Sequence, residues 1–524
     1  MSFATKARTL AFGALACALS ACKTQGPVHP GNVQIPVPDT QGKGELEPTR
    51  ESPPESGPQR ETPFPKIEQE DLASGLTLDV VSLRTLPLVQ IRLLVKSGTA
   101  ADGDFTGLAS MTAKMLKDGG AGRWSSKELL AKIETLGADL GIEVGPDSTV
   151  LSLAVAKAHF DEAMDLLGTV AREPRWDEQE FTKLKKRQTQ KVADKAKASG
   201  TWAATMLVWR ELYRLPTGLH PYASYDALPS ELARITSKSC REFYQKNFTP
   251  KNTEIVVGGD VDADAAKKAV ERAFGTWKGG EISPASFAEA TPPNRLKILL
   301  ADRPKSAQSD IYVASLGPTR KDESWTAVKV ANQILGGGVS GRLFLDVREK
   351  RSLAYNTRSS VGELSRGPVP IMAYAGTQTA KTGLAVQALL DNLKRISTEP
   401  ASEDELNTAR RYLADVFAVR METVGAVSDM VVSLRVLGLP DEYYDTYRKE
   451  IRDVSADRAL RAIGEHVREG HAVIAVAGDA ERIAPVLSHF GDVIVYSPEK
   501  EFERVRSIAA NPQASIELER EAGQ

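Results

Sequence analysis

The sequence predicts an α+β protein built from two homologous halves. Two observations lead to this prediction: pairs of β-branched strands precede the helices, and the landmarks of residues 66–285 return 219 positions later in residues 286–505. A length of 524 residues suits two to four domains, and a content of 41% hydrophobic and 26% charged residues is that of a globular chain. We therefore expect two α/β-layer halves of equal length.

An apolar run near the start of the chain has the character of an export signal. Basic residues precede the run, which spans residues 9–21 and is too short to cross a bilayer as a helix. It ends in Leu-Ser-Ala-Cys at Cys22, which resembles the lipobox of bacterial lipoproteins, where the signal is removed before a cysteine that is then acylated. Residues 1–22 are therefore expected to be a lipoprotein signal peptide, with Cys22 as the lipidation site. The alternative is an ordinary signal peptide that contains a cysteine.

The segment after the signal is expected to be a tether. Residues 23–65 hold ten of the 29 prolines and have almost no apolar periodicity, so they cannot bury enough surface to offset the entropy of ordering. The polar tail, residues 506–524, is expected to be disordered as well. Because Lys23 and not Asp follows the cysteine, we expect the lipid anchor in the outer rather than the inner membrane of a bacterial envelope, with the protein facing the periplasm.

Each half repeats the same order of strands and helices. Matching apolar strands end at Asp260 and at Asp479, 219 positions apart, and three further landmarks share this offset. The helix after the first strand pair has Leu108, Met111 and Met115 on one face. The expected elements are strands 76–84 and 89–96, helices 107–117 and 177–195, strands 296–300 and 310–315, and helices 325–335 and 403–420.

These landmarks resemble the insulinase/pitrilysin family of zinc peptidases, in particular its shorter members related to mitochondrial processing peptidase. The stretches that carry the resemblance are SGTAADGDFTGLASMTAKMLKDGG, GADLGIEVGPDSTVLSLAV, LPSELARITSKSCREFYQKNFTPKNTEIVVGGD and LGGGVSGRLFLDVREKRSLAYNTRS. The resemblance covers about residues 66–500. It implies a duplicated insulinase-like fold whose two halves enclose a chamber, with peptidase sites formed between halves or between subunits.

The zinc motif of that family is missing from this chain. Active members carry His-x-x-Glu-His on the first helix, because two imidazoles one turn apart bind zinc while the carboxylate acts as general base. Here Ser110 and Lys114 occupy the histidine positions and Ala113 occupies the position of the general base. The third ligand of the family, a Glu on a later helix, corresponds to Lys191 or Gln190. The resemblance therefore implies that this chain binds no metal and performs no zinc catalysis alone.

The remaining histidines do not suggest a displaced metal site. The chain contains six histidines, and only His466 and His471 lie close to each other in the sequence, with Glu469 between them. Side chains five positions apart on a helix differ in direction by about 140°, so these two cannot bind one metal from a single helix. An active chain with a zinc site elsewhere is therefore the least favoured alternative.

The second half contains an element that the resemblance connects with substrate. Gly336, Gly337 and Gly338 begin a glycine-rich stretch that leads to Arg348 and, seven residues later, Tyr355. In the family an Arg and a Tyr with this spacing contact the substrate, the Tyr near the scissile carbonyl, and the glycines form a flexible loop that guides the peptide. A guanidinium offers donors to peptide carbonyls, and a phenol can donate to an oxyanion. The alternative is that Arg348 forms a surface ion pair and that Tyr355 packs.

We therefore predict a non-catalytic, substrate-binding subunit of a two-chain insulinase-like zinc metallopeptidase that acts on peptides outside the cytoplasm. The expected partners are a zinc-bearing insulinase-like subunit, which supplies the metal, a peptide substrate, and a membrane reached through the lipid anchor. The alternative is a non-catalytic structural or peptide-binding lipoprotein of a larger envelope complex. Nucleic acid is not an expected partner, because the net charge is −2 and the basic stretch 183–197 contains no interleaved aromatic residues and is interpreted as a solvated helix face.

Overall fold

The computed structural model describes residues 63–518, apart from 216–219, 281, 283–286 and 469. The expected signal peptide with Cys22, and the expected tether up to residue 62, lie outside the described residues. Among the described residues, no helix is both long enough and apolar enough to cross a membrane.

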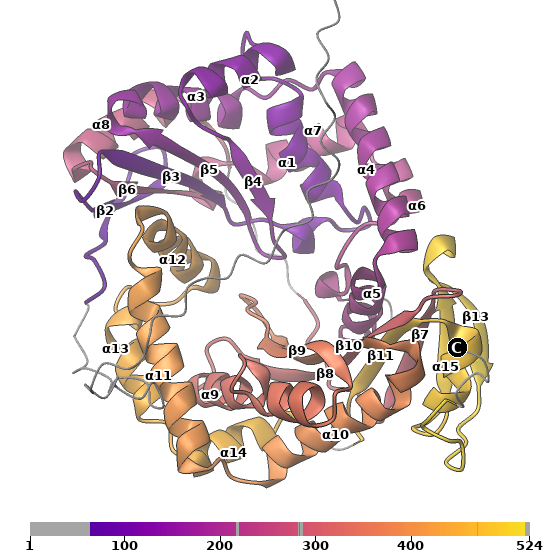
Figure 1. Ribbon diagram of the computed structural model, residues 1–524. Coiled ribbons are helices and arrows are strands. Elements are labelled where there is room, and N and C mark those ends of the chain that lie inside the picture. The colour runs from indigo at the N-terminus through magenta and orange to yellow at the C-terminus, as the bar shows by residue number, and fades with distance from the viewer. Residues whose placement is uncertain (1–62, 216–219, 281, 283–286, 469, 519–524) are drawn as a thin grey trace, which may run out of the picture. The chain divides into compact units, whose positions relative to one another are not determined.

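Two mixed β-sheets form the centre of the fold (Figure 1). The first sheet contains β1 (Glu68–Asp71), β2 (Thr77–Ser82), β3 (Leu88–Val95), β4 (Gly141–Val144), β5 (Thr149–Ala156) and β6 (Thr253–Gly259). The second contains β7 (Lys297–Asp302), β8 (Gln308–Thr319), β9 (Ala354–Val361), β10 (Pro368–Gln378), β11 (Val473–Gly478), β12 (Val493–Ser497) and β13 (Glu503–Ile508).

The strand orders show that the two halves share one topology. The first sheet is ordered β1-β2-β6-β3-β5-β4 and the second β13-β12-β7-β11-β8-β10-β9. The five-strand core β2-β6-β3-β5-β4 therefore corresponds to β7-β11-β8-β10-β9. In both cores the first pair, β2 with β6 and β7 with β11, is parallel, and the other pairs are antiparallel. The predicted α+β fold with two homologous halves is confirmed.

The helices follow the same duplicated order. Those of the first half are α1 (Leu108–Asp118), α2 (Ser126–Thr135), α3 (Phe160–Arg172), α4 (Glu178–Ala198), α5 (Gly200–Leu212), α6 (Pro229–Arg234), α7 (Ser237–Asn247) and α8 (Ala263–Phe274). Those of the second half are α9 (Trp325–Gly336), α10 (Thr382–Thr398), α11 (Glu403–Arg420), α12 (Val424–Leu437), α13 (Tyr443–Arg452), α14 (Ala456–Gly464) and α15 (Ala480–Leu487).

One helix of each half packs against the sheet of the other half. Helix α5 packs on β8 and β11 of the second sheet, while α12 packs on β3 and β6 of the first (Figure 1). In β2, Val80 belongs to the core on the side of α3 and α8, whereas Val81 packs with Val427 and Val431 of α12. Successive strand residues point to opposite faces, so both faces of the first sheet are covered. This coverage explains why β6 and β11 are buried along their whole length.

The second half extends further than the boundary at residue 505 expected from the sequence. Strand β13 continues to Ile508 and pairs antiparallel with β12, with Val493 opposite Ile508. The prediction of a disordered tail from residue 506 is therefore wrong for the first residues of that segment. The side chains of β13 are largely exposed, so the order of this polar strand comes from its backbone hydrogen bonds to β12, which apolar periodicity does not reveal.

Candidate functional site

Helix α1 carries the positions where an active relative would hold zinc. It begins after Gly107, whose φ of 92° and close approach to the Ala227 side chain favour glycine. The carboxylate of buried Asp102 accepts hydrogen bonds from the backbone N–H groups of Gly107 (2.6 Å) and Ala109 (2.7 Å). Burial raises the pKa of Asp102 to about 7, against the effect of these hydrogen bonds. Two hydrogen bonds to one buried carboxyl group thus hold the start of α1 in place.

A cavity of about 300 Å³ replaces the zinc site. Ser110 and Lys114 of α1 line it together with Gln188 and Lys195 of α4 and the carboxylate of Asp226. That carboxylate is already engaged, since it pairs with Lys195 Nζ at 2.6 Å and accepts a hydrogen bond from Trp202 Nε1 at 3.0 Å. Ala113, at the position of the general base, is fully buried.

The side chains around this cavity do not fit a zinc ion. Zinc sites are built from imidazole, thiolate and carboxylate donors. This cavity offers two ammonium groups, which repel a cation, and two carboxyl groups, Asp102 and Asp226, which already accept hydrogen bonds from the protein. Burial, and after it the charge of Lys191, lowers the pKa of Lys114. Within the described ranges, no group of three or more His, Cys, Asp or Glu residues could hold a metal ion.

Helix α4 also lines this cavity with Gln188, which the sequence did not single out. Gln190 and Lys191, the two positions considered for the third ligand, are exposed and line a larger cleft on α4. Gln188 lines the cavity, together with Val192 and Lys195. Gln188, Val192 and Lys195 are separated by four and three residues, which places them on one face of the helix. The helical periodicity of the basic stretch therefore predicts this face.

We expect the purified chain to contain no stoichiometric zinc and to leave unstructured peptides intact. The combined variant Ser110→His, Ala113→Glu and Lys114→His should bind zinc weakly at best, because neither Lys191 nor Gln188 of α4 supplies a carboxylate as third ligand. Elemental analysis and a peptide cleavage assay measure both expectations. One zinc per wild-type chain, with cleavage that a chelator abolishes, would contradict them.

The predicted substrate element forms a stacked group at the surface. Arg348 lies on a π-helical segment (Phe344–Lys350), and its guanidinium lies 4.6 Å from the ring centre of Phe344 and 4.7 Å from that of Tyr355. Tyr355 is 82% exposed, and its hydroxyl has no hydrogen-bond partner in the part of the chain that the structure describes. Arg348 also contacts Glu349 at 3.4 Å, which is the surface ion pair of the alternative interpretation.

Close packing requires glycine at two of the three glycine positions before this element. A Cβ on Gly336 would lie 2.8 Å from the backbone nitrogen of Ser359, and one on Gly337 would lie 2.2 Å from the side-chain oxygen of Gln333. Gly338 meets no atom nearer than 3.6 Å. The structure thus explains Gly336 and Gly337 by close packing, while the space at Gly338 would admit a side chain.

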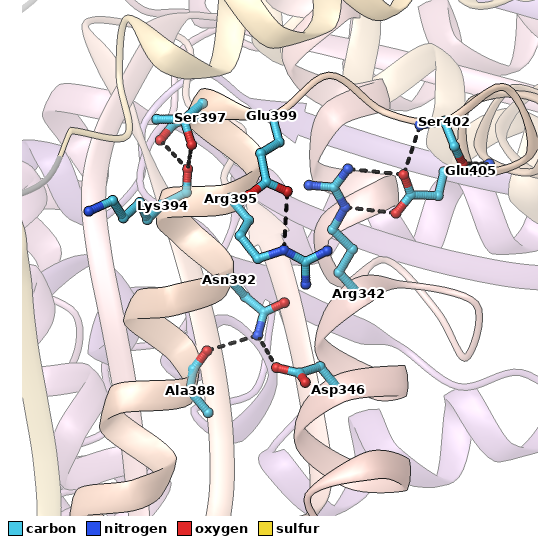
Figure 2. Close-up of polar contacts among 11 residues, drawn as sticks. Arg342, Asp346, Ala388, Asn392, Lys394, Arg395, Ser397, Glu399, Ser402 and Glu405 are labelled. Atoms are coloured by element: carbon cyan, nitrogen blue, oxygen red, sulfur yellow. Dashed lines mark hydrogen bonds and ion pairs between the residues drawn. The ribbon is translucent and has the colours of Figure 1, made fainter.

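A buried arginine anchors the segment that carries Arg348 (Figure 2). Arg342 donates to Glu405 of α11 through Nε (2.7 Å) and Nη2 (2.9 Å), and the backbone N–H of Ser402 donates to the same carboxylate. Asn392 of α10 donates to Asp346 at 2.7 Å. The pairs join residues 63 and 46 positions apart, so sequence spacing gave no sign of them. They hold the base of the π-helical segment and leave the face with Arg348 and Tyr355 free.

Comparisons with known proteins agree with this geometry. The sequence model described as insulinase (peptidase family M16) matches residues 80–218, and the model described as peptidase M16 inactive domain matches residues 234–413. A non-peptidase homolog, YmxG, of Helicobacter pylori is 22% identical over 409 residues, covering 76% of this chain and 90% of its own. An uncharacterized zinc protease of Streptomyces coelicolor is 28% identical over 251 residues, which span 47% of this chain and only 54% of that relative.

Solved structures share the fold. A peptidase M16 inactive domain from Pseudomonas fluorescens superposes with a TM-score of 0.72 at 24% identity and covers 79% of this chain and 98% of its own. A protease from Helicobacter pylori gives the same TM-score at 17% identity, with 79% and 100% coverage. The matches in both halves show that the chain belongs to the insulinase family of peptidases, M16, as a peptidase-like member that is similar to a non-peptidase homolog.

Proposed function

We propose that this chain is the substrate-binding, non-catalytic subunit of a two-chain insulinase-like zinc metallopeptidase that acts on peptides outside the cytoplasm. One observation carries the proposal: the chain presents Arg348 and Tyr355 together at its surface, although α1 has lost every zinc donor. A side chain that is 82% exposed adds little to the core, so Tyr355 is better explained by a ligand than by packing.

The side chains of Arg348 and Tyr355 are suited to bind a peptide while its peptide bond is cleaved. The ring of Tyr355 and the ring of Phe344 both support the guanidinium of Arg348, which leaves N–H groups available to peptide carbonyl oxygens. The unpartnered hydroxyl of Tyr355 can donate to the oxygen that gains charge when water attacks the scissile carbonyl. The attacking water and its activation would come from the zinc-bearing partner.

Two exposed apolar side chains belong to the same stretch of the chain as this element. Val339 after the glycines is 70% exposed, and Leu345 on the π-helical segment is 52% exposed. Exposed apolar residues that gather beside a polar element are typical of an interaction site. A partner subunit or the bound peptide would bury them.

Reconstitution tests the proposal. A mixture of this chain with a zinc-bearing insulinase-like subunit should cleave a fluorogenic peptide, whereas either chain alone should not. If the zinc-bearing subunit alone cleaves as fast as the mixture, this chain contributes nothing to the reaction, and the alternative of a structural or peptide-binding envelope lipoprotein takes its place.

The envelope location is part of the proposal and rests on Cys22. We expect Cys22→Ser to leave the precursor unacylated and to move the protein from the membrane fraction to the soluble fraction, because acyl chains supply the binding free energy. Mass spectrometry and fractionation measure both effects, with Cys240→Ser as the matched control. Cys240 is buried in the core, so its replacement should leave the lipid and the membrane association unchanged. Unaltered mass and location of the Cys22 variant would contradict the lipid anchor.

A further inference from the structure

A cleft of about 1260 Å³ runs along α4 and has a strongly basic lining. Its walls are α4 with the start of α5 on one side and the connection from β7 to β8 on the other. The cationic side chains that line it are Lys183, Lys186, Arg187, Lys191, Lys195 and Arg303, and the carboxylates are Asp194 and Asp310. Six positive groups against two negative ones leave a formal excess of four, in a chain whose net charge is −2.

The two carboxylates of the cleft are already satisfied by the protein. Asp310 accepts hydrogen bonds from Thr201 Oγ1 (2.9 Å) and from the Tyr374 hydroxyl (2.7 Å). Asp194 accepts a hydrogen bond from Gln190 Nε2 at 2.8 Å. Neither carboxylate is therefore paired with the lysines around it in the described residues.

Several of the cationic groups lack such a partner. Lys186 and Lys191 form no hydrogen bond or ion pair with any residue that the structure describes, and Arg303 Nε is buried without an acceptor. Lys183, Arg187 and Lys195 pair with acidic residues that do not themselves line the cleft. Such partly exposed pairs contribute little and can be exchanged for the carboxylates of a ligand.

The basic lining continues into the cavity that replaces the zinc site. Lys195 belongs to both spaces, and Lys114 forms part of the wall of the smaller one. The charges of Lys191 and Lys195 act together with burial to lower the pKa of Lys114, so the three ammonium groups lie within electrostatic reach of one another. Like charges held together in a partly enclosed space attract anions.

We propose that this cleft binds an extended peptide segment with acidic side chains at alternate positions. Lys183, Arg187, Lys191 and Lys195 form a row on α4 with an interval of four residues. At a rise of about 1.5 Å per residue, this interval is about 6 Å. Every second side chain of an extended peptide lies on one face, about 6.6 Å apart. The row therefore matches the spacing of Glu-x-Glu-x-Glu.

A nucleic acid strand fits the cleft less well. Proteins that bind single strands combine a basic groove with aromatic side chains on which bases stack. No aromatic side chain is among the residues that line this cleft. The inference goes beyond the proposed function, because it concerns this chain by itself and requires no partner subunit.

Binding of labelled peptides to the full-length chain tests the inference. A dye-labelled heptapeptide in which Glu alternates with Ser should bind, and the peptide with Gln in place of Glu should bind at least about tenfold more weakly in fluorescence anisotropy. The same number of Glu residues placed consecutively should bind several-fold more weakly than the alternating peptide. The variant Lys186→Gln/Lys191→Gln should weaken binding of the alternating Glu peptide about tenfold.

The matched control removes two exposed lysines elsewhere. Lys127 of α2 and Lys268 of α8 do not line the cleft, so Lys127→Gln/Lys268→Gln should bind the alternating peptide as the wild type does. Equal binding of the Glu and Gln peptides, or an equal loss in the control variant, would overturn the inference. Tighter binding of a short single-stranded DNA than of the Glu peptide would overturn it in favour of nucleic acid. These results leave the role of Arg348 and Tyr355 untouched, because the assay contains no peptidase partner.

Discussion

Tyr355→Phe is expected to slow peptide cleavage by the reconstituted pair about 10²–10³-fold, equivalent to about 2.7–4 kcal/mol of transition-state stabilisation. The physical reason is the loss of a single donor. A phenyl ring can still stack against the guanidinium of Arg348, now 4.7 Å from the ring centre, so the position of the side chain should not change. The exposed hydroxyl makes no hydrogen bond to described residues, so folding should not change either. Steady-state kinetics on a fluorogenic peptide measure the effect.

Arg348→Ala should show a different kinetic signature. Its donors would hold the peptide in the ground state and in the transition state alike, so the loss should raise KM more than it lowers kcat. Arg348→Lys keeps the charge but loses the planar group that stacks between Phe344 and Tyr355, and should recover only part of the affinity.

Tyr412→Phe is the matched control for the tyrosine. Tyr412 lies on α11, is 49% exposed, and should tolerate the change with no effect on cleavage. If Tyr355→Phe and Arg348→Ala both cleave at the wild-type rate in a verified complex, the pair does not contact substrate. The chain would then be a structural or peptide-binding subunit.

The parts of the fold with local signals could be predicted from the sequence. The β-branched runs at β2, β3, β7 and β8 and the apolar face of α1 agree with the structure to within a few residues. The exchange of α5 and α12 between the sheets could not be predicted. The apolar residues of α12 are as compatible with the sheet of its own half as with Val81 and Val256 of the other, and local periodicity does not distinguish them.

The residues of the site could likewise be predicted only in part from the sequence. The loss of zinc donors follows from the identities of Ser110 and Lys114 once α1 is placed. The residue of α4 that lines the cavity was harder to predict, because each step of one residue along a helix turns the side-chain direction by about 100°. Gln188 lines the cavity beside Lys114, whereas Gln190 and Lys191 line the larger cleft, although the charge of Lys191 still acts on Lys114.

The sequence marks one residue of the charged contact between the halves but does not identify its partner. Asp79 is an acidic residue inside the apolar strand β2, and it is 0% exposed. Its carboxylate accepts hydrogen bonds from Arg435 of α12 through Nη2 (2.8 Å) and Nε (3.0 Å), 356 positions away. Glu254 on the neighbouring strand lies 3.8 Å from the same guanidinium, and burial raises its pKa. Arg435 therefore compensates Asp79, and together with Lys96 it compensates Glu254, at the contact between the halves.

Arg435→Met is accordingly expected to lower the free energy of unfolding by about 3–5 kcal/mol, because it leaves Asp79 buried without its cation. The double variant Asp79→Leu/Arg435→Met should recover much of this loss, since an apolar pair avoids the desolvation of both charges. The matched control Arg395→Met removes an exposed pair with Glu399 and should change the stability by less than about 1 kcal/mol. Urea denaturation followed by circular dichroism gives all three values. Equal stability of Arg435→Met and Arg395→Met would contradict a structural role for the buried pair.

The pH dependence of the Arg435→Met variant separates lost charge compensation from lost packing. Burial already raises the folded-state pKa of Glu254, and loss of the guanidinium should raise it further above the unfolded value, so the folded state binds more protons than the unfolded state between the two values. Stability then falls as the pH rises through this window and returns as the pH falls toward the unfolded pKa of about 4. The deficit relative to wild type should therefore be largest near pH 8 and shrink as the pH approaches about 5. A deficit that stays constant over this range would assign the effect to the lost contacts of the arginine side chain with α12 and the first sheet.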